Sequence, residues 1–501
     1  MRKICAALFL LLTATIFAQT SVFSKKYQMS SDYFRAQSIV PAFDKGLLCA
    51  GQTNFGSKKG VVMKTDSLGN VAWSKMYTFG TGILFLKGIC RTSDSCYAVA
   101  GTLGSNVLCM KLKKNGDTVW VKNIVSAGNV NSIQQTKDKG YILTSSDGLA
   151  VVTKIDSLGN FQWKQRINSA NQQNYGITTK QLADSSYAVL VYRETNISSV
   201  FMGHTTLIHL TKTGNLDWAK SYNKATQLFN WGLDMEVVED GIIVFMNVYA
   251  NDPIGLLKTD LAGNFVWCKT YPGIGINTLP DFRKLLRTKD KGFVFGTDRA
   301  IKTDSIGIPI WINTFNNPQP HIPYDLAETK DKKIASVSYY YGSSFTDEVH
   351  VITMDSLGNS AACTQSVPTS VWFEGWVATA ITPTLISGGS VAPITATIAA
   401  ITVSSSSGCP PVYPWSVNEQ GENRISLEIS PNPSEGMFNL KIKENIKVQY
   451  FISDVTGRQI VKGNCERETL IDISNEASGV YLLHIIDSKG HTLDTRKLIK
   501  K

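Results

Sequence analysis

The sequence lacks the short motifs that mark most hydrolases, metalloenzymes and nucleotide-binding proteins. It contains no G-x-S-x-G, no H-E-x-x-H and no phosphate-binding loop. No C-x-x-C and no His-rich stretch offers a zinc site. Of the few histidines, His204 and His209 are five residues apart, which places them on opposite faces of a strand. We therefore predict no catalytic residue, no metal site and no cofactor, and we leave open whether the protein is an enzyme.

Charge is scarce and unclustered. Only 18% of the residues are charged, and the 50 basic and 40 acidic residues, which give a formal net charge of +10, are spread along the chain. No basic arm and no basic patch interleaved with aromatics is present, so we predict no nucleic-acid partner. The excess charge is compatible with a weak attraction to anionic polymers of a cell surface.

A long apolar run occurs only at the N-terminus. Arg2 and Lys3 precede an apolar stretch at residues 4–17, and Ala18 comes before the polar Gln19. This pattern predicts a secretory signal peptide at residues 1–18, which is too short to span a membrane. No later apolar run reaches about 18 residues, so we predict no transmembrane segment.

Cysteines are few for an exported chain of this length. Export permits disulfides, and two pairs of cysteines are placed so that they could form them. Cys90 and Cys96 flank a turn, and Cys363 and Cys409 flank one segment. Buried free thiols are the alternative.

What the chain does contain is one motif in several copies. Lys-Thr-Asp-Ser-Leu-Gly-Asn-Val-Ala-Trp at residues 64–73 returns, slightly changed, at residues 154–163 and 258–267. Each copy is typical of a β-hairpin, in which Gly supplies the turn and an aromatic strand follows. The glycines of the seven copies are Gly69, Gly116, Gly159, Gly214, Gly263, Gly307 and Gly358, and the tryptophans are Trp73, Trp120, Trp163, Trp218, Trp267 and Trp311.

A second motif alternates with the first. Thr-Lys-Asp-Lys-Gly occurs at residues 136–140 and 288–292, and looser copies bring the number to seven, one ahead of each glycine turn. The unit is therefore four short strands, and its tryptophans recur every 43 to 55 residues. This period is typical of a β-propeller blade. A solenoid of β-hairpins is the competing architecture.

The two ends of the repeat region complement one another. Residues 23–27 copy residues 73–77 although no turn precedes them, whereas the last turn, at Gly358, is followed by no aromatic residue. Pairing the N-terminal strand with the last repeat would complete a blade and remove two open edges. We therefore predict an all-β chain whose residues 19–363 form a seven-bladed β-propeller closed by the N-terminal strand.

Residues 364–424 form a Ser/Thr/Pro-rich extension. Apolar and polar residues alternate at residues 377–386 and 391–403, which predicts one additional hairpin. Residues 404–408, with the prolines Pro410, Pro411 and Pro414 behind them, predict a linker.

The last unit, residues 425–501, has alternating strands and turn residues that predict a small Ig-like β-sandwich. Four landmarks follow in order: Pro-Asn-Pro-x-x-Gly, Asp-x-x-Gly-Arg, Ser-Gly-x-Tyr and a basic end. With them the unit resembles the type A C-terminal sorting domain of the type IX secretion system. The matching positions are Pro431, Asn432, Pro433, Gly436, Asp454, Gly457, Arg458, Gly479, Tyr481, Lys497 and Lys500.

This resemblance implies transport across the outer membrane after the signal peptide has acted. The implied partners are the type IX translocon and its sorting peptidase, with anionic lipopolysaccharide as an attachment partner after processing. The implied location is the cell surface or the medium.

The repeat suggests three functional interpretations. The D-x-x-G-x-x-x-W pattern resembles the tryptophan-docking motif of quinoprotein propellers, but the adjacent Cys pair and acidic set of those enzymes are missing. One Asp and one Asn per turn are too few oxygens for calcium and are what such turns select for backbone reasons. Asp-Ser-Leu/Ile also resembles the acceptor of bacterial periplasmic O-glycosylation, at Ser67, Ser157, Ser305 and Ser356.

The sequence therefore predicts an exported recognition protein whose propeller binds a glycan or a protein on one face. Tyr339, Tyr340, Tyr341 and Phe345 are first candidates for exposed aromatics on that face. A polysaccharide-degrading enzyme is the first alternative and would show clustered carboxylates at the channel mouth. A structural surface component is the second.

Overall fold

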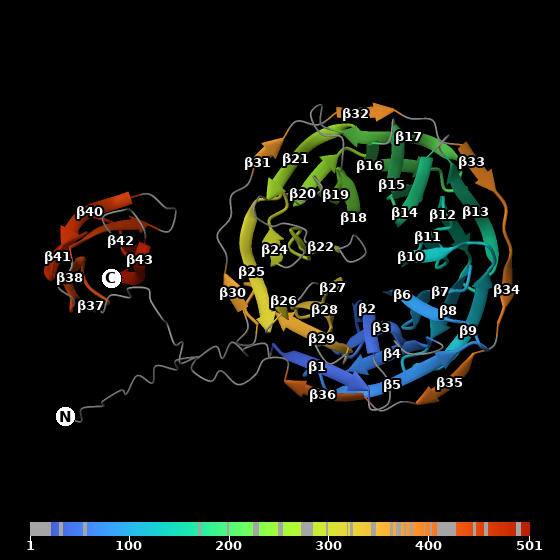
Figure 1. The fold of residues 1–501 in the computed structure, drawn as a ribbon, viewed down its shortest axis with the longest axis horizontal. Helices are drawn as coiled ribbons and strands as arrows, with labels where there is room; N and C mark the ends of the chain where they lie inside the picture. The colour runs from blue at the N-terminus through green and yellow to red at the C-terminus, as the bar shows by residue number, and fades with distance from the viewer. Residues whose placement is uncertain are drawn as a thin grey trace, which may run out of the picture. The chain divides into compact units, whose positions relative to one another are not determined.

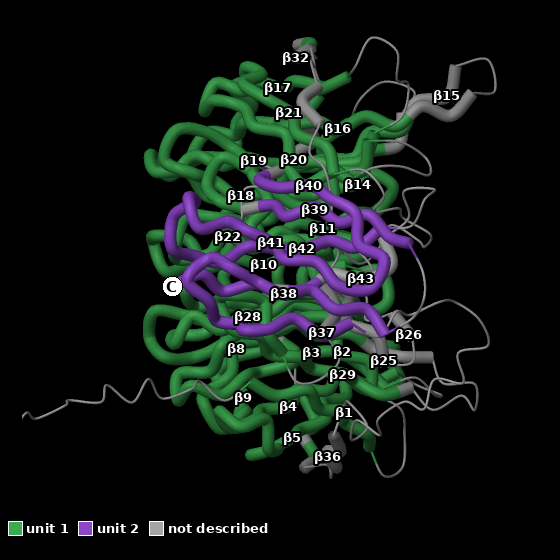
Figure 2. The backbone as a smooth tube through the Cα atoms, turned by 90° about the vertical axis from the view of Figure 1, so that its left-hand side faces the viewer, with its two compact units in different colours: residues 1–413 green, residues 414–501 purple. Residues whose placement is uncertain are grey.

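The computed structural model divides the chain into two compact units, residues 1–413 and 414–501 (Figure 2). It describes residues 22–29, 34–53, 58–168, 172–197, 200–223, 230–248, 254–271, 284–296, 299–317, 319–320, 324–341, 347–360, 364–366, 372–374, 377–380, 384–394, 396–400, 403–407, 427–443, 447–454, 459–486 and 492–501. The predicted signal peptide, Phe345, Cys363, Cys409, Gly457 and Arg458 lie outside these ranges. Within them, no helix is long and apolar enough to cross a membrane.

Unit 1 is a ring of seven antiparallel sheets, the seven-bladed β-propeller that the repeat predicts (Figure 1). The innermost strand of each blade comes first in the chain, because each four-strand repeat runs from the centre outwards. Blade 1 is β2 (Phe34–Pro41), β3 (Leu47–Thr53), β4 (Gly60–Thr65) and β5 (Val71–Thr78). Blade 2 is β6 (Leu84–Arg91), β7 (Tyr97–Leu103), β8 (Asn106–Leu112) and β9 (Thr118–Ile124), and blade 3 is β10 (Asn129–Gln135), β11 (Tyr141–Ser146), β12 (Ala150–Ile155) and β13 (Phe161–Asn168).

The remaining blades repeat this order. Blade 4 is β14 (Gln172–Gln181), β15 (Tyr187–Ile197), β16 (Val200–Leu210) and β17 (Leu216–Asn223), and blade 5 is β18 (Trp231–Val238), β19 (Gly241–Asn247), β20 (Ile254–Thr259) and β21 (Phe265–Tyr271). Blade 6 is β22 (Leu285–Arg287), β23 (Phe293–Gly296), β24 (Arg299–Thr303) and β25 (Pro309–Asn317), with β26 (Gln319–Pro320) pairing the end of β25.

The seventh blade combines both ends of the repeat region. It contains β27 (Asp325–Glu328), β28 (Ile334–Tyr341) and β29 (Asp347–Met354), and its fourth strand is the N-terminal β1 (Ser24–Met29). Strand β1 pairs antiparallel with β29, with Ser24 opposite Ile352 and Tyr27 opposite Val349. The ring is thus closed by main-chain pairing between residues about 330 apart in the sequence, such as the hydrogen bond from the Thr353 amide to the Phe23 carbonyl at 2.8 Å.

The extension behind the seventh blade circles the ring. Its strands do not form the predicted hairpin; each pairs with the outer strand of a different blade, in the reverse order of the chain (Figure 1). They are β30 (Thr364–Ser366) on blade 6, β31 (Trp372–Glu374) on blade 5, β32 (Val377–Ala380) on blade 4, β33 (Thr384–Ser387) on blade 3, β34 (Val391–Pro393) on blade 2, β35 (Thr397–Ala400) on blade 1 and β36 (Val403–Ser407) on blade 7. We call these seven strands the belt.

The hairpin prediction was therefore wrong, and so was the linker at residues 404–407, which lie in β36. Alternation of apolar and polar residues predicts strands but does not indicate which strand each one pairs with. The outer strand of each blade has an open edge, and an open edge pairs with any strand that reaches it. The belt covers all seven edges.

The two sequence motifs prove to be the two halves of one ion pair. The Lys that begins the first motif extends from the third strand of a blade to the Asp of the turn between the first and second strands. The pairs are Lys64–Asp44, Lys111–Asp94, Lys154–Asp138, Lys258–Asp240 and Lys302–Asp290, with N–O distances of 2.5 to 2.8 Å. Blade 4 substitutes His209, which contacts Ser186, and blade 7 substitutes Lys333, which pairs with Asp331.

Four of these five lysines are buried and Lys258 is half-buried, so each pair holds a turn to the body of its own blade. Lys154 and Lys302 each have a side chain that is 2% exposed. Removing an Asp would leave the ammonium group without its counter-charge, but solvent reduces this cost because the Asp side chains are more than half exposed.

Neighbouring blades are joined by aromatic rings that lie on the turn glycines. A Cβ atom on Gly116 would meet the Trp73 ring at 2.8 Å, and one on Gly263 would meet the Trp218 ring at 2.6 Å. The same contact recurs around the ring, and on blade 1 the aromatic residue is Phe23, at 2.6 Å from Gly69. These glycines also have φ between +74° and +85°, which favours Gly. The tryptophans and glycines of the repeat are thus positioned at every blade junction.

Unit 2 is the small β-sandwich that the sequence predicts. One sheet is β37 (Leu427–Ser430), β38 (Met437–Ile442) and β41 (Glu468–Asp472). The other is β40 (Gln459–Cys465), β39 (Val448–Asp454), β42 (Gly479–Ile486) and β43 (Thr492–Lys500). Their inner faces enclose a core that includes Phe438, Leu440, Ile452, Leu483 and Leu498.

Several sorting-motif residues meet at one corner of unit 2. The Asn432 side chain accepts a hydrogen bond from the Ile499 amide at 2.9 Å. The Lys500 ammonium, 8% exposed, donates to the Ser474 carbonyl at 2.7 Å, and a Cβ atom on Gly436 would lie 2.6 Å from the Ser474 Cα. The Pro-Asn-Pro-x-x-Gly loop therefore packs on the end of the C-terminal strand.

No disulfide joins the cysteines that the structure describes, which are Cys49, Cys90, Cys96, Cys109, Cys268 and Cys465. Cys90 and Cys96 accordingly form no bridge, and the buried-thiol alternative applies to most of this set. Burial raises the pKa of the Cys49 and Cys109 thiols, which makes them poor nucleophiles.

Candidate functional site

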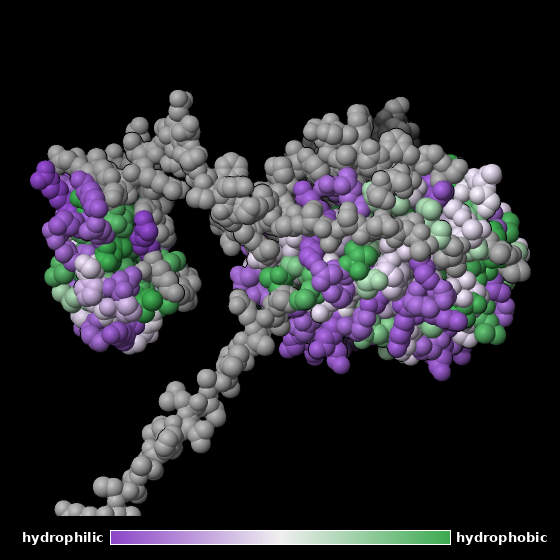
Figure 3. All heavy atoms as spheres, turned by 90° about the horizontal axis from the view of Figure 1, so that it is seen from below, coloured by the Kyte–Doolittle hydropathy of each residue, from purple (hydrophilic) through white to green (hydrophobic). Residues whose placement is uncertain are grey.

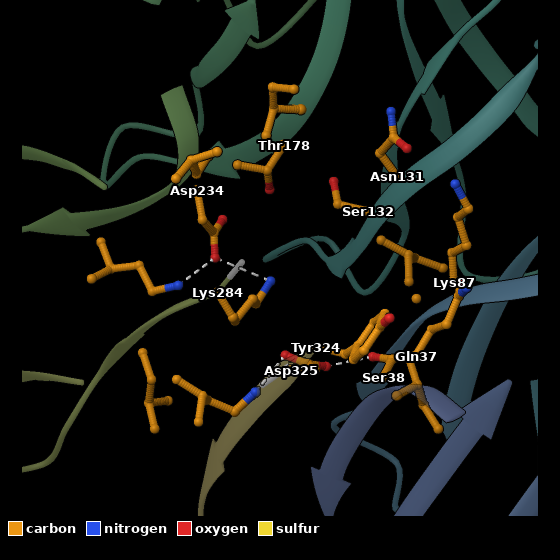
Figure 4. Close-up of a pocket in the computed structure, with 18 of the residues that line it drawn as sticks. Gln37, Ser38, Lys87, Asn131, Ser132, Thr178, Asp234, Lys284, Tyr324 and Asp325 are labelled. Atoms are coloured by element: carbon orange, nitrogen blue, oxygen red, sulfur yellow. Dashed lines mark hydrogen bonds and ion pairs between the residues drawn. The ribbon is translucent and has the colours of Figure 1, made fainter. Parts of the chain in front are cut away.

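The centre of the ring is a cavity of about 1090 Å³. Every blade contributes to its wall through its innermost strand or the residue beside it (Figure 4). The volume is sufficient for a small ligand such as an oligosaccharide of a few rings. This cavity is the candidate site.

A β-bulge in five of the inner strands directs one side chain of each into the wall. The register of each inner strand against the second strand shifts at the same place. Bulges commonly re-aim a side chain next to a binding site. The bulged residues that line the cavity are Gln37, Lys87, Asn131, Ile177 and Leu233.

One position lines the cavity in every blade: it lies six residues before the turn aspartate, and in blades 1 to 5 it directly follows the bulge. Around the ring it is Ser38, Gly88, Ser132, Thr178, Asp234, Lys284 and Asp325. Six of these side chains are drawn in Figure 4, where they come from all sides of the cavity. The charged members of the set are adjacent, in blades 5, 6 and 7.

The two aspartates of this set join neighbouring blades. Asp234 accepts a hydrogen bond from the Leu285 amide of blade 6 at 3.0 Å. Asp325 accepts from the Ser38 hydroxyl at 2.6 Å and from the Ile39 amide of blade 1 at 2.9 Å. Both carboxylates are therefore used within the protein, as connections between blades.

Lys284 lies between them and 3.3 Å from Asp234. Burial by itself would lower the pKa of Lys284, but Asp234, Asp325 and Glu236 outweigh it and raise that pKa. Burial raises the pKa of Asp325, and the nearby Lys284 only partly opposes this effect. Lys284 is thus ion-paired with Asp234 and is also stabilised in its charged form by the nearby Asp325.

Most other carboxylates of the wall also have partners. Glu236 pairs with Lys180 at 2.8 Å, Asp147 with Arg166 at 3.0 Å, and Glu328 accepts from the Lys289 amide at 2.8 Å. A catalytic pair of carboxylates needs one free nucleophile or base and one free acid. Among the carboxylates that the structure describes in the wall, only that of Glu194 lacks a hydrogen bond or ion pair.

The groups left to meet a ligand are of mixed chemistry. Within the described part of the chain, Gln37, Lys87, Ser132, Thr178 and Glu194 line the cavity without a hydrogen bond or ion pair of their side chains. They offer two amide donors, an ammonium, two hydroxyls and a carboxylate. This set suits a neutral ligand with many hydroxyl groups better than a strongly charged one.

Three aromatic residues form one corner of the cavity. The rings of Tyr175 and Tyr192 stack with centroids 6.0 Å apart, and Trp231 meets Tyr192 edge to face at 4.9 Å. They come from blades 4 and 5 and lie beside Glu194 in the wall. An aromatic surface next to polar groups can hold the apolar face of a sugar ring while its hydroxyls are hydrogen-bonded.

Sequence reasoning did not find this corner. It proposed Tyr339, Tyr340 and Tyr341, which lie in β28 with side chains outside the described set, and Phe345, which is outside the described residues. Tyr175, Tyr192 and Trp231 belong to different strands, and only the ring brings them together. His204 and His209 contact Asn223 and Asp217 respectively, in separate hydrogen-bond networks.

The predicted acceptor serines lie on turns. Ser67, Ser305 and Ser356 are exposed and Ser157 is half-buried, each in the turn that follows the third strand of its blade. Within the described residues no cluster of three or more His, Cys, Asp or Glu could hold a metal ion. The turn aspartates that suggested calcium accept hydrogen bonds from their own turns, as Asp66 does from the Leu68 and Asn70 amides.

Comparison with known proteins identifies the C-terminal unit. A family model described as "Secretion system C-terminal sorting domain" matches residues 428–501. Unit 2 is therefore a sorting domain, and the chain is a cargo of the type IX secretion system, exported to the outer membrane or the medium. No curated protein matches the chain.

Solved structures similar to this chain include propellers. A catalytically inactive variant of virginiamycin B lyase from Staphylococcus aureus with quinupristin has 10% identity and a TM-score of 0.44, over 67% of this chain and 100% of the other. The Dos1 propeller has 10% identity and a TM-score of 0.41, over 66% and 95%. A protein of unknown function from Bacteroides caccae has 11% identity and a TM-score of 0.32, over 50% and 93%. At such values these likenesses do not bear on the ligand.

Proposed function

We propose that the exported propeller is a recognition protein that binds a carbohydrate in its central cavity. The observation that carries this proposal is the aromatic corner of Tyr175, Tyr192 and Trp231 beside unpaired polar groups. Sugar rings present apolar C–H faces and hydroxyl edges, which match these two kinds of wall.

Recognition is better supported than turnover. Asp234 and Asp325 hold neighbouring blades together, and Glu236, Asp147 and Glu328 have partners of their own. Recruiting any of them as an acid or a base would break a contact that supports the ring. Glu194 alone does not make the pair of carboxylates that glycoside hydrolysis needs.

We also propose that the export machinery recognises the corner of unit 2 where Asn432, Gly436 and Lys500 meet. Because this corner contains residues from both ends of the domain, it forms only when the whole domain has folded. The sorting peptidase, and lipopolysaccharide after cleavage, are the further partners proposed on this basis.

A glycan-array screen of the purified protein, followed by calorimetry of each hit, tests the cavity proposal. We expect Trp231→Ala and Lys87→Met each to weaken binding at least about tenfold, because a buried aromatic or charged contact contributes about 1.4 kcal/mol or more. Lys139→Ser, on an exposed turn away from the cavity, is the matched control and should bind like the parent protein.

Two outcomes would contradict this function. Binding that survives both cavity substitutions would place the ligand elsewhere on the molecule. Shortened or modified glycan in the mass spectrum after incubation would show turnover, and Glu194→Gln would then be the first variant to assay for its loss.

A further inference from the structure

The propeller has a second unusual surface, at the ends of the blades where the tight turns lie. In an antiparallel blade the turn between the first and second strands and the turn between the third and fourth strands lie at the same end. We call this end the turn face. It is independent of the central cavity and of the carbohydrate proposal.

Exposed large hydrophobic residues gather on the turn face. Among the described residues of unit 1, the only exposed large hydrophobic residues outside the turn face are Ile83 and Val125. The turn residues are 38% to 70% exposed, which is high for leucine and isoleucine. The set comprises Leu68, Leu158, Leu261, Ile306, Ile308 and Leu357 in the turns and Val119, Val266 and Ile310 at the start of the strands that follow.

The turn itself does not require these side chains. Blade 2 has Asn115 and blade 4 has Thr213 at the place where blade 1 has Leu68, and their glycines keep the same positive φ. A polar residue therefore forms the same turn. Formation of the turn therefore does not explain why leucine occupies this exposed position.

Lysines on the same face occupy a conformation that other residues would fill more easily. Lys45, Lys139, Lys291 and Lys332 have φ between +63° and +70°, in the left-handed region that disfavours a side chain with a Cβ atom. All four are exposed. Blades 2 and 4 have Ser95 and Ser185 at this position, with φ of 62° and 73°, so the turn does not depend on lysine either.

These lysines supply charge that the face does not neutralise. The neighbouring turn aspartates are already paired with the buried lysines of their own blades, as Asp138 is with Lys154. The aspartates of the other turns lie near lysines of the preceding blade, as Asp66 lies near Lys25 and Asp260 near Lys220. Only Lys291 of the four has an ionic partner within the described residues, Glu239 at 3.8 Å.

We propose that the turn face docks on an anionic lipid surface, with the leucines entering the interface and the lysines meeting the headgroups. A ring of apolar tips with cations beside them fits a surface that is apolar below and anionic above. Figure 3 shows hydrophilic residues predominating along the lower rim of the ring, with single hydrophobic ones among them. A second copy of this chain fits poorly, because two basic faces repel one another.

Vesicle flotation of the purified protein tests the proposal, after its intact mass has shown that it carries no glycan. We expect binding to vesicles of phosphatidylcholine with about a third phosphatidylglycerol, little binding to phosphatidylcholine alone, and release as salt is raised. We also expect the protein to sediment as a monomer under all of these conditions.

Residues at the equivalent positions of other blades serve as conservative substitutions for the variants. L68N, L158N and L357N copy Asn115, and K45S, K139S and K332S copy Ser95 and Ser185. We expect each triple variant to weaken partitioning onto anionic vesicles at least about tenfold, with an unchanged melting temperature. Ile83→Asn with Val125→Asn, away from the turn face, is the matched control and should partition like the parent protein.

Three results would overturn the proposal. They are equal partitioning of the parent protein and both triple variants, no partitioning of the parent protein at low salt, and dimerisation that the leucine variant abolishes. The last result would identify the turn face as a protein interface instead.

Discussion

The turns of the propeller and the wall of its cavity use the same seven-fold repeat in opposite ways. At the turns, Gly69 and its six counterparts are all glycines with nearly one φ angle. At the cavity position six residues before the turn aspartate, the seven blades present Ser, Gly, Ser, Thr, Asp, Lys and Asp. The turns are alike because each must fit the same neighbour, an aromatic ring of the preceding blade. The cavity positions share one open space, so each can differ.

The largest expected effect comes from breaking the turns. Gly263→Val should lower the free energy of unfolding by about 3 kcal/mol, because it adds left-handed strain to a clash with the Trp218 ring. Gly104→Val is the matched control: its φ is 62° but no atom lies within 4 Å of its Cβ position. It should cost about 1 kcal/mol. Equal losses in urea denaturation would show that the ring contact contributes nothing.

We expect acid to destabilise blade 7, which combines strands from both ends of the repeat region. Burial lowers the pKa of His350 to about 4, and its Nε2 contacts the Ser24 hydroxyl of β1 at 2.8 Å. Because the folded pKa lies below the unfolded value of about 6.5, the stability is fully present above pH 6.5 and declines towards pH 4. The loss should approach about 3 kcal/mol.

His350→Gln keeps a hydrogen-bonding side chain and removes this titration. Its melting temperature should fall less than that of the parent protein between pH 6.5 and 4. Parallel pH profiles would assign the acid sensitivity to other groups, such as the buried His204, whose pKa burial also lowers.

The smallest expected effect concerns the serines of the turns. We propose that Ser67, Ser157, Ser305 and Ser356 carry O-linked glycans in the exporting cell, as their Asp-Ser-Leu/Ile context suggests. Replacing all four with Ala should change stability by less than about 0.5 kcal/mol, because the side chains lie on a surface turn. The intact mass of the exported protein should fall by whole sugar units.

An unchanged glycan mass in that variant would remove these serines from consideration. Lipid docking and glycosylation of the serines are proposed for the same turn face, so each affects the other. A glycan on Ser67 would lie beside Leu68 and shield it, so a glycosylated protein should partition less onto vesicles than an unmodified one.

Much of the cavity wall could not be predicted from the sequence. The bulges at Lys87 and Asn131 are single-residue irregularities in strands whose alternation looks ordinary. The aromatic corner depends on which blades are neighbours and on how far Trp231 of blade 5 reaches towards Tyr192 of blade 4. The belt was missed for a related reason, since its short strands carry no mark of the edges they join.

By itself the sequence determined the number of blades, the closure by the N-terminal strand and the sorting domain. These follow from local rules: a glycine where φ is positive, an aromatic residue after it, and alternation within each strand. Only the tertiary structure decided that Lys64 and Asp44 form one pair, that Asp325 bonds to blade 1 and that the extension encircles the ring. The physical reason is that hydrogen bonds and ion pairs between strands depend on which groups the closed ring brings within about 3 Å, and spacing along the chain does not encode this distance.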